Sequence, residues 1–195
     1  MRNDQLQQFN IILASGSPRR QQFFKDLGLT FEIRLKPVKE EYPERLKHYE
    51  ISDYLAQLKS LPFKDELQDQ DILITSDTIV WHNDTALGKP RSHQEAFNML
   101  SAMSDQTHEV ITSVCFTTTT SEKTVNAVTK VTFKALSDAE INYYIDTFKP
   151  FDKAGAYGIQ EWIGQIGITK IEGSYTNVVG LPTHLVYKTL NRMVL

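Results

Sequence analysis

The residues best suited to chemistry begin with a run of hydroxyls and cations, SGSPRR, at positions 15–20. Ser17 and Pro18 predict the start of a helix, which places Arg19 and Arg20 in its first turn. A helix N-terminus already presents free amides and the positive end of a dipole, so cations there are misplaced unless an anion faces them. We interpret the run as a phosphate site, because guanidinium groups grip phosphate oxygens through paired hydrogen bonds. The alternative is a capped helix with two solvated arginines.

An isolated carboxylate, Asp77, lies between two apolar runs in DILITSDTIVW, residues 71–81. Burying a carboxylate among apolar residues is costly unless it is paired, bound to a metal or placed at the edge of a cleft. Asp77 is therefore a candidate catalytic group. The alternative is a turn residue at a strand end, hydrogen-bonded to backbone.

Two loops bring further polar groups next to small residues. GKP, residues 88–90, places Lys89 in a loop framed by Gly and Pro, which suits an ammonium that faces phosphate. A solvated lysine is the alternative there. The segment FDKAGAYGIQ, residues 151–160, contains small residues between 154 and 158 that would let the backbone approach a ligand closely. Lys153 precedes these small residues and Gln160 follows them. The amide of Gln160 offers a donor and an acceptor together, so it can read the edge of a base.

Local signals predict the elements that must position these residues. An apolar strand ends at residues 11–13 and leads into the helix capped by Ser17, and capping boxes open two later helices. The apolar spacing over residues 51–58 predicts a helix with Lys59 on its flank, and the β-branched segments 108–116 and 125–136 predict an antiparallel pair. The other expected elements are a strand over 31–35, the capping pairs Ser92/Glu95 and Ser137/Glu140, a turn over 173–177 and a last helix that begins at Pro182.

Composition limits the class of protein. The chain of 195 residues suits one domain, 1–195, and its net charge of −3 disfavours a nucleic-acid polymer as partner. No apolar run is long enough to span a membrane and the N-terminal residues lack the hydrophobic stretch of a signal peptide, so we expect a cytoplasmic protein. The single cysteine, Cys115, lies in an apolar segment and is expected in the core.

The chain contains six short motifs, in this order: LASGSPRR, SDTIV, GKP, THEV, DKAGAYGIQ and NVVGLP. Their order and spacing resemble those of the Maf family of nucleoside-triphosphate pyrophosphatases, and the resemblance extends from residue 11 to about 190. The resemblance implies an α/β fold, a mixed twisted sheet flanked by helices, with the nucleotide in a cleft between two lobes. It implies hydrolysis of a nucleoside triphosphate to the monophosphate and pyrophosphate, assisted by Mg²⁺ or Mn²⁺. The family further suggests a homodimer.

Carried over to this sequence, the resemblance assigns Asp77 as the catalytic carboxylate, acting on water or holding the metal, with Glu40 as a second metal ligand. The branch that acts on dTTP and UTP resembles this chain at Arg19, Thr78 and Gln160. The phosphate-binding residues implied by the family are Ser15, Ser17, Arg19, Arg20, Lys59, Lys89 and Lys153.

Two other functions stay open at this point. One is a pyrophosphatase for 7-methyl-GTP or another purine nucleotide, and the other is a non-catalytic nucleotide-binding regulator of cell division. The chain also departs from the family pattern. Glu161 stands beside Gln160 where glycine is usual, which adds a charge next to the base-reading amide, whereas Ser60 and Asp105 are expected to matter little.

Overall fold

The computed structural model describes residues 6–193, which divide into two compact units. The first takes in the described residues up to Asp77, then Thr112–Ala127 and the described residues from Gly180. The second consists of Thr78–Ile111 and Val128–Val179. Each unit is thus assembled from segments that are separated in the sequence. The expectation of a single domain over 1–195 stays a prediction.

The strands of the described chain form a mixed sheet in the order β2-β1-β3-β5-β6-β7, with β4 paired to β3. β1 pairs in parallel with β2 and β3, whereas β4 and β7 pair antiparallel with their neighbours. The expected mixed sheet flanked by helices is confirmed, and the expected nucleotide cleft stays a prediction. The strands are β1 (Asn10–Leu13), β2 (Glu32–Ile33), β3 (Asp71–His82), β4 (Thr85–Leu87), β5 (Thr107–Thr117), β6 (Glu122–Phe133) and β7 (Ile168–Glu172).

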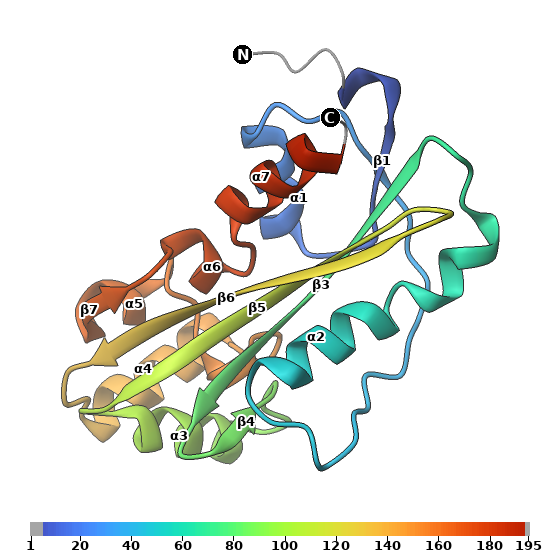
Figure 1. The fold of residues 1–195 in the computed structure, drawn as a ribbon. Helices are drawn as coiled ribbons and strands as arrows, with labels where there is room; N and C mark the ends of the chain where they lie inside the picture. Colours follow the sequence, from blue (N-terminus) through green and yellow to red (C-terminus); the bar gives the residue numbers. More distant parts are fainter. Residues whose placement is uncertain (1–5, 194–195) are drawn as a thin grey trace. The chain divides into compact units, whose positions relative to one another are not determined.

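In the first unit, alternate residues of β1 and β3 enter two different cores, as the two-residue period of a strand requires. One core joins these strands to α1 (Pro18–Asp26) and α7 (Thr183–Met193), which are labelled in Figure 1. The other joins them to the short helix η2 (Leu61–Glu66). The first core contains Ile11, Leu13, Phe24, Ile72, Ile74, Val186 and Leu190, and the second contains Ile12, Phe63 and Leu73.

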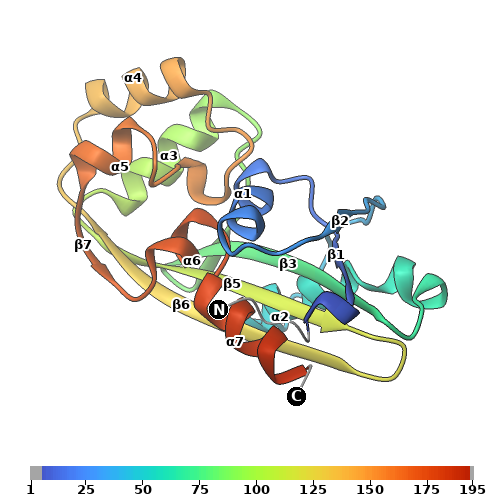
Figure 2. The ribbon, with the colours of Figure 1, turned by 90° about the horizontal axis from the view of Figure 1, so that it is seen from above.

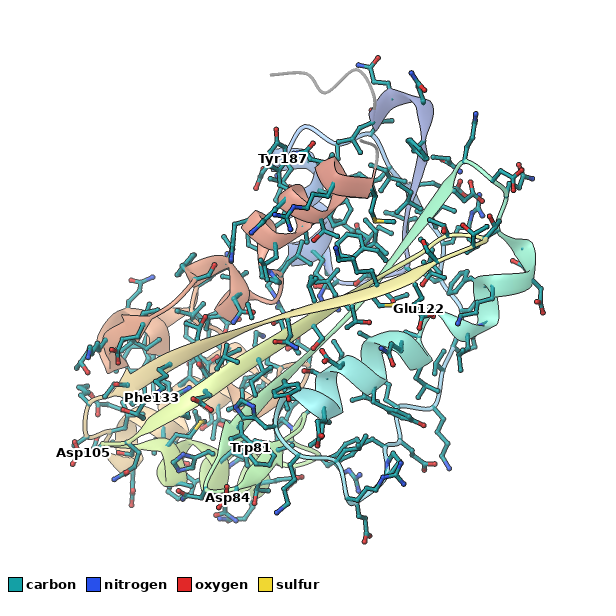
Figure 3. The ribbon with its side chains drawn as sticks, in the orientation of Figure 1. Trp81, Asp84, Asp105, Glu122, Phe133 and Tyr187 are labelled. Carbon is teal, nitrogen blue, oxygen red and sulfur yellow. The ribbon has the colours of Figure 1, made fainter. Side chains whose placement is uncertain are left out.

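In the second unit, α3 (His93–Met103), α4 (Asp138–Phe148) and α5 (Trp162–Gly167) lie together, as Figure 2 shows. A tight hairpin joins β3 to β4 through Asn83 and Asp84, whose φ angles are 48° and 57° (Asp84 is labelled in Figure 3). Positive φ at both loop residues matches the type I′ turn, in which Asn and Asp are favoured. The remaining elements of this unit are the short helix η3 (Ala154–Ala156) and α6 (Tyr175–Val179).

The helix starts follow the expected capping chemistry at two of three places. Ser137 and Glu140 form the full capping box at α4. At α3, the hydroxyl of Ser92 accepts a hydrogen bond from the amide of Glu95 at 3.1 Å. Ser17 precedes α1 as expected, but its hydroxyl accepts no capping bond, so that part of the prediction is wrong. The amide of Ser17 instead donates to Oγ of Ser15 at 3.3 Å.

The strands differ from expectation in their bounds. The strand expected over 31–35 is only β2, and the second strand of the β5–β6 pair runs from Glu122 to Phe133 rather than over 125–136. A connection of four residues between neighbouring strands makes that pair antiparallel, as predicted. The turn expected over 173–177 is largely the start of α6. Cys115 is fully buried, as predicted.

β3 is one continuous strand across the whole segment 71–82, so Asp77 lies inside it and the turn alternative for this residue is wrong. No helix within residues 6–193 combines the length and the apolar character needed to cross a bilayer.

Candidate active site

Asp77 meets Lys59 in the first unit because β3 presents alternate side chains to α2 (Tyr49–Leu58). Thr75, two residues earlier on the same face, donates its hydroxyl hydrogen to the carbonyl of Ala56 in α2 at 2.6 Å. Lys59 is the first residue after α2, and its ammonium donates to Oδ1 of Asp77 at 2.6 Å. Asp77 is only 6% exposed, so this ion pair is largely shielded from water.

Glu40 reaches the same ammonium from the segment between β2 and α2. Its Oε1 lies 3.1 Å from Nζ of Lys59, and its side chain is 47% exposed. One lysine therefore holds two carboxylates that are 37 positions apart in the sequence, one of them buried and one half-exposed. The arrangement places two oxygen ligands and one cation at a single point of the first unit.

Arg20 carries the second positive charge near this point. Its Nε donates to the carbonyl of Gly180 at 2.9 Å and its Nη1 to the carbonyl of Ser76 at 3.0 Å. These two backbone acceptors hold the guanidinium beside the residue that precedes Asp77. The pKa of Arg20 is lowered by burial, and the negative charge of Asp77 offsets part of this shift.

The pKa of Asp77 is raised above the ordinary value for an aspartate, chiefly by burial. The charge and hydrogen bond of Lys59 and the charge of Arg20 lower it, whereas Glu40 raises it further. A carboxylate whose pKa is raised in this way accepts a proton more readily than an exposed aspartate does.

The remaining expected residues of the first unit lie around the start of α1. Ser15 is buried, and its Oγ accepts the hydrogen bond from the amide of Ser17 at 3.3 Å. Its carbonyl accepts a hydrogen bond from the side chain of Gln21 at 3.1 Å. Arg19 lies close enough to Arg20 for its charge to lower the pKa of the latter. Two cations thus stand together at a helix start that has no acidic residue in its first turn.

The other expected residues lie in the second unit. The carbonyl of Gly88 accepts a hydrogen bond from the amide of Gly155 at 3.0 Å, which ties the loop of Lys89 to the segment after Lys153. Lys89 and Gln160 are exposed, whereas the side chain of Lys153 is 11% exposed. Thr78 begins this unit directly after Asp77.

A family model described as Maf-like protein matches residues 10–193. The chain belongs to the Maf family.

Several curated relatives match this Maf chain over nearly their whole length. A dTTP/UTP pyrophosphatase from Flavobacterium johnsoniae is 61% identical over 194 residues, covering 100% of both chains. A protein of the same name from Christiangramia forsetii is 57% identical, covering 100% of this chain and 99% of the relative. Another from Phocaeicola vulgatus is 46% identical and covers 97% and 99% of the two chains. A solved structure described as nucleoside-triphosphatase / dITP/XTP pyrophosphatase, from Mycobacterium abscessus, is 13% identical to this chain. Its TM-score is 0.44, over 95% of this chain and 96% of that one.

The carboxylates of this Maf protein can be compared with what a divalent cation requires. Among the residues that the structure describes, no group of three or more His, Cys, Asp or Glu side chains could hold a metal ion. Glu40 and Asp77, however, both reach Nζ of Lys59, so they supply two oxygen ligands at one place. Mg²⁺ is commonly held by one or two carboxylates plus substrate phosphates rather than by a complete protein cage. The residues present therefore fit such an ion.

Sequence reasoning missed how Lys153 is held in this Maf chain. Its ammonium lies 2.8 Å from Oδ1 of Asp152 and 3.0 Å from Oε1 of Glu161. Oε2 of Glu161 in turn accepts a hydrogen bond from the hydroxyl of Tyr144. The only sequence signal was Glu161 itself, a charged residue at a position where the resemblance leads one to expect glycine. Nothing local indicated its partners, because Tyr144 is 17 positions away on another helix.

Proposed function

We propose that this chain hydrolyses dTTP and UTP to the monophosphate and pyrophosphate. Relatives named dTTP/UTP pyrophosphatase match it over their full length at 57–61% identity, a level at which the same reaction is expected. The observation that carries the chemistry is the buried carboxylate of Asp77, held at 2.6 Å by Lys59 beside Arg20. Binding alone would not require a desolvated carboxylate among these cations.

In the proposed reaction, water attacks the α-phosphorus, and the bond from that phosphorus to the bridging oxygen breaks so that pyrophosphate leaves. Asp77 takes the proton of the attacking water, which its raised pKa favours. Arg20, its guanidinium oriented by two backbone carbonyls, stabilises negative charge on the phosphate oxygens, together with Arg19. Lys89 and Lys153 bind the polyphosphate as further cations.

A divalent cation would be held by Glu40 and Asp77, with Mg²⁺ and Mn²⁺ as the two candidates. Such an ion supplies charge neutralisation on the triphosphate and lowers the pKa of a bound water. Lys59 then has a second role in this proposal, because its ammonium keeps the two carboxylates together before the nucleotide and its metal bind. Ser15 and Ser17 complete the phosphate site at the start of α1.

The base preference in this proposal rests on Arg19, Thr78 and Gln160. Gln160 is exposed on the surface of the second unit, where its amide can meet a ligand. A pyrimidine such as thymine or uracil presents an acceptor and a donor on one edge, which a single amide can match. The cytoplasmic location and the homodimer stay predictions, and chain mass in solution measured by light scattering would decide the latter.

Pyrophosphate release from dTTP, UTP and 7-methyl-GTP, measured side by side with Mg²⁺ and with Mn²⁺, tests the proposal. We expect turnover of dTTP and UTP to exceed that of 7-methyl-GTP by about tenfold or more. A preference for 7-methyl-GTP would favour the purine alternative. Tight nucleotide binding without release of pyrophosphate would instead favour the non-catalytic regulator.

A further inference from the structure

The turn that carries Gln160 is held at both ends by one buried hydroxyl. Tyr144, on α4, is fully buried, and its hydroxyl oxygen accepts a hydrogen bond from the amide of Gly158 at 3.0 Å. The same hydroxyl donates its hydrogen to Oε2 of Glu161. Burial, together with the bond to Glu161, raises the pKa of Tyr144, so the phenol keeps its proton as a donor. The segment 158–161 is therefore attached to α4 at its first and its last residue.

The backbone of this turn is also packed too closely for side chains at two glycines. A Cβ at Gly158 would lie 2.9 Å from Cδ of Glu161 and 3.0 Å from Cε of Lys153. A Cβ at Gly164, in α5, would overlap the carbonyl oxygen of Ile159. The amide of Glu161 donates to the carbonyl of Gly158 at 3.0 Å, which closes the turn. The turn is thus closed by a backbone hydrogen bond and packs closely against α5 at Ile159.

Gln160 projects from this turn next to the carboxylate that anchors it. Ile159, before it, is buried with 8% of its surface exposed, and Glu161, after it, begins α5 as the N-terminal cap residue. Only Gln160 of these three faces solvent as an exposed residue. The turn therefore places one amide side chain on the surface between two fixed neighbours.

We propose that Glu161 is a positioning residue for base selection, which together with Tyr144 fixes the turn 158–161 so that the amide of Gln160 meets the base in one orientation. This inference rests on the proposed function and on the role of Gln160 within it. Glu161 stands where the family resemblance leads one to expect glycine, so the carboxylate anchor is a feature of this chain's own sequence.

The physical reason is that an amide carries a donor and an acceptor at nearly the same place. Rotation by half a turn exchanges them, so a mobile glutamine can pair with thymine and with cytosine, whose edges show opposite donor and acceptor patterns. Discrimination needs the amide to be held in position before the base arrives, so that the wrong base leaves polar groups unpaired. A turn attached at both ends supplies that restraint.

The contact of Glu161 with Lys153 has a different consequence, which separates the two roles experimentally. Lys153 is paired with both Asp152 and Glu161, so removing either carboxylate increases the positive charge available to phosphate. That change acts on the triphosphate, which dTTP and dCTP share. It should alter kcat/KM for both nucleotides in parallel and leave their ratio unchanged.

The test is the ratio of kcat/KM for dTTP over dCTP in the full-length protein and in four variants. We expect Glu161→Ala and Tyr144→Phe to lower this ratio by about tenfold, because a displacement of the amide by about 1 Å is enough for an effect of that size or more. Glu161→Gln keeps an oxygen that can accept the Tyr144 hydrogen and should retain the ratio of the parent. Asp152→Asn, which weakens the pairing of Lys153 but keeps both partners of the hydrogen bond between Tyr144 and Glu161, is the matched control and should leave the ratio unchanged.

An unchanged ratio in Glu161→Ala would overturn the inference. Because Glu161 is partly exposed, Glu161→Ala should fold and give this result even if Tyr144→Phe does not fold. Hydrogen exchange at the amides of residues 158–161, measured without nucleotide, should become faster in Glu161→Ala and stay as in the parent in Asp152→Asn. Equal exchange in the two variants would also contradict the inference. If the parent protein hydrolyses neither nucleotide, the proposed function is wrong and the inference fails with it. If the parent hydrolyses dTTP but Glu161→Ala leaves the ratio unchanged, only the inference is wrong.

Discussion

Lys59, the first residue after α2, places its ammonium 2.6 Å from Oδ1 of Asp77, a carboxylate in the interior of β3. A helix end and a mid-strand position thus form one buried ion pair within the first unit. Burial outweighs the attraction of Lys59 in setting the pKa of Asp77, so neutralising this carboxylate should affect activity strongly without lowering stability.

Asp77→Asn should remove most of the turnover while keeping the fold. The amide has the shape of the carboxylate but accepts no proton at neutral pH, so we expect pyrophosphate release from dTTP to fall by about 10²–10⁴-fold. Asp84→Asn is the matched control, because it makes the same change at an exposed turn residue with a φ of 57°, which Asn tolerates. Equal rates for Asp77→Asn and the parent would show that the assignment is wrong.

The same Asp77→Asn variant should be at least as stable as the parent at pH 7. Burial raises the pKa of Asp77 above 3.8, so the folded state binds this proton more tightly than the unfolded state does. The charged carboxylate therefore lowers the free energy of unfolding at neutral pH. This cost shrinks as the pH falls through the raised pKa of the folded state and is gone below 3.8. Thermal melts at pH 7 and pH 4 should show the melting temperature of the variant above or equal to that of the parent, with the difference shrinking at the lower pH. A variant that is less stable at pH 7 contradicts this.

Lys59→Met should move the acidic limb of the activity profile to higher pH. Lys59 is the largest of the influences that lower the pKa of Asp77, and its loss leaves burial and Glu40 to raise that pKa further. The fraction of charged Asp77 at a given acidic pH then falls, and kcat/KM falls with it. The measurement is kcat/KM for dTTP between pH 5 and 9. Lys64→Met, which breaks the more exposed pair with Glu122, should keep the profile of the parent.

Removal of divalent ions by a chelator should abolish turnover in every variant. Glu40→Gln should in addition raise the concentration of Mn²⁺ or Mg²⁺ needed for half-maximal activity. The reason is that Glu40 is one of the two carboxylates gathered by Lys59, and losing a charged ligand weakens the binding of a hard cation. Glu41→Gln is the neighbouring control, since Glu41 pairs instead with exposed Lys39 at 2.6 Å. Equal metal requirements in the two variants would remove Glu40 from the metal site.

His108 should make the protein sensitive to mild acid. Burial, with a smaller effect of His82, lowers the pKa of His108 from 6.5 to about 3, and its Nε2 lies 2.7 Å from the hydroxyl of Tyr157. The unfolded state gains a proton below pH 6.5 and the folded state does not, so stability is full above that pH and is lost as the pH falls.

The expected slope for His108 is about 1.4 kcal/mol of unfolding free energy per pH unit. Urea unfolding at pH 7 and 5 should show a smaller loss in His108→Gln than in the parent. His93→Gln changes a half-exposed histidine and should lose as much stability on acidification as the parent. The same loss in the parent and in His108→Gln would contradict the prediction.

The sequence by itself determined the features that depend on near neighbours along the chain. Ser137 and Glu140 specify the start of α4 because both capping bonds form within four residues, and Pro18 specifies the start of α1 through its own fixed φ. The pairing of β5 with β6 was predictable for the same reason, since a connection of four residues leaves only an antiparallel arrangement. The missing capping bond of Ser17 was not predictable in this way, and the hydroxyl near the start of α1 that does accept a backbone hydrogen bond is that of Ser15.

Only the tertiary structure decided which charges meet. Asp77 was identifiable as a costly carboxylate between apolar runs. Its place inside a continuous strand depends on pairing of β3 with segments far away in the sequence, with β1 over Asp71–Ile74 and with β5 as its other neighbour. Its partner Lys59 is set by the packing of α2 on the face of β3 that carries Thr75 and Asp77. Tyr144 likewise reaches Glu161 from another helix. Local preferences carry no information about such contacts, because the free energy that selects them comes from burying whole faces of helices and strands against one another.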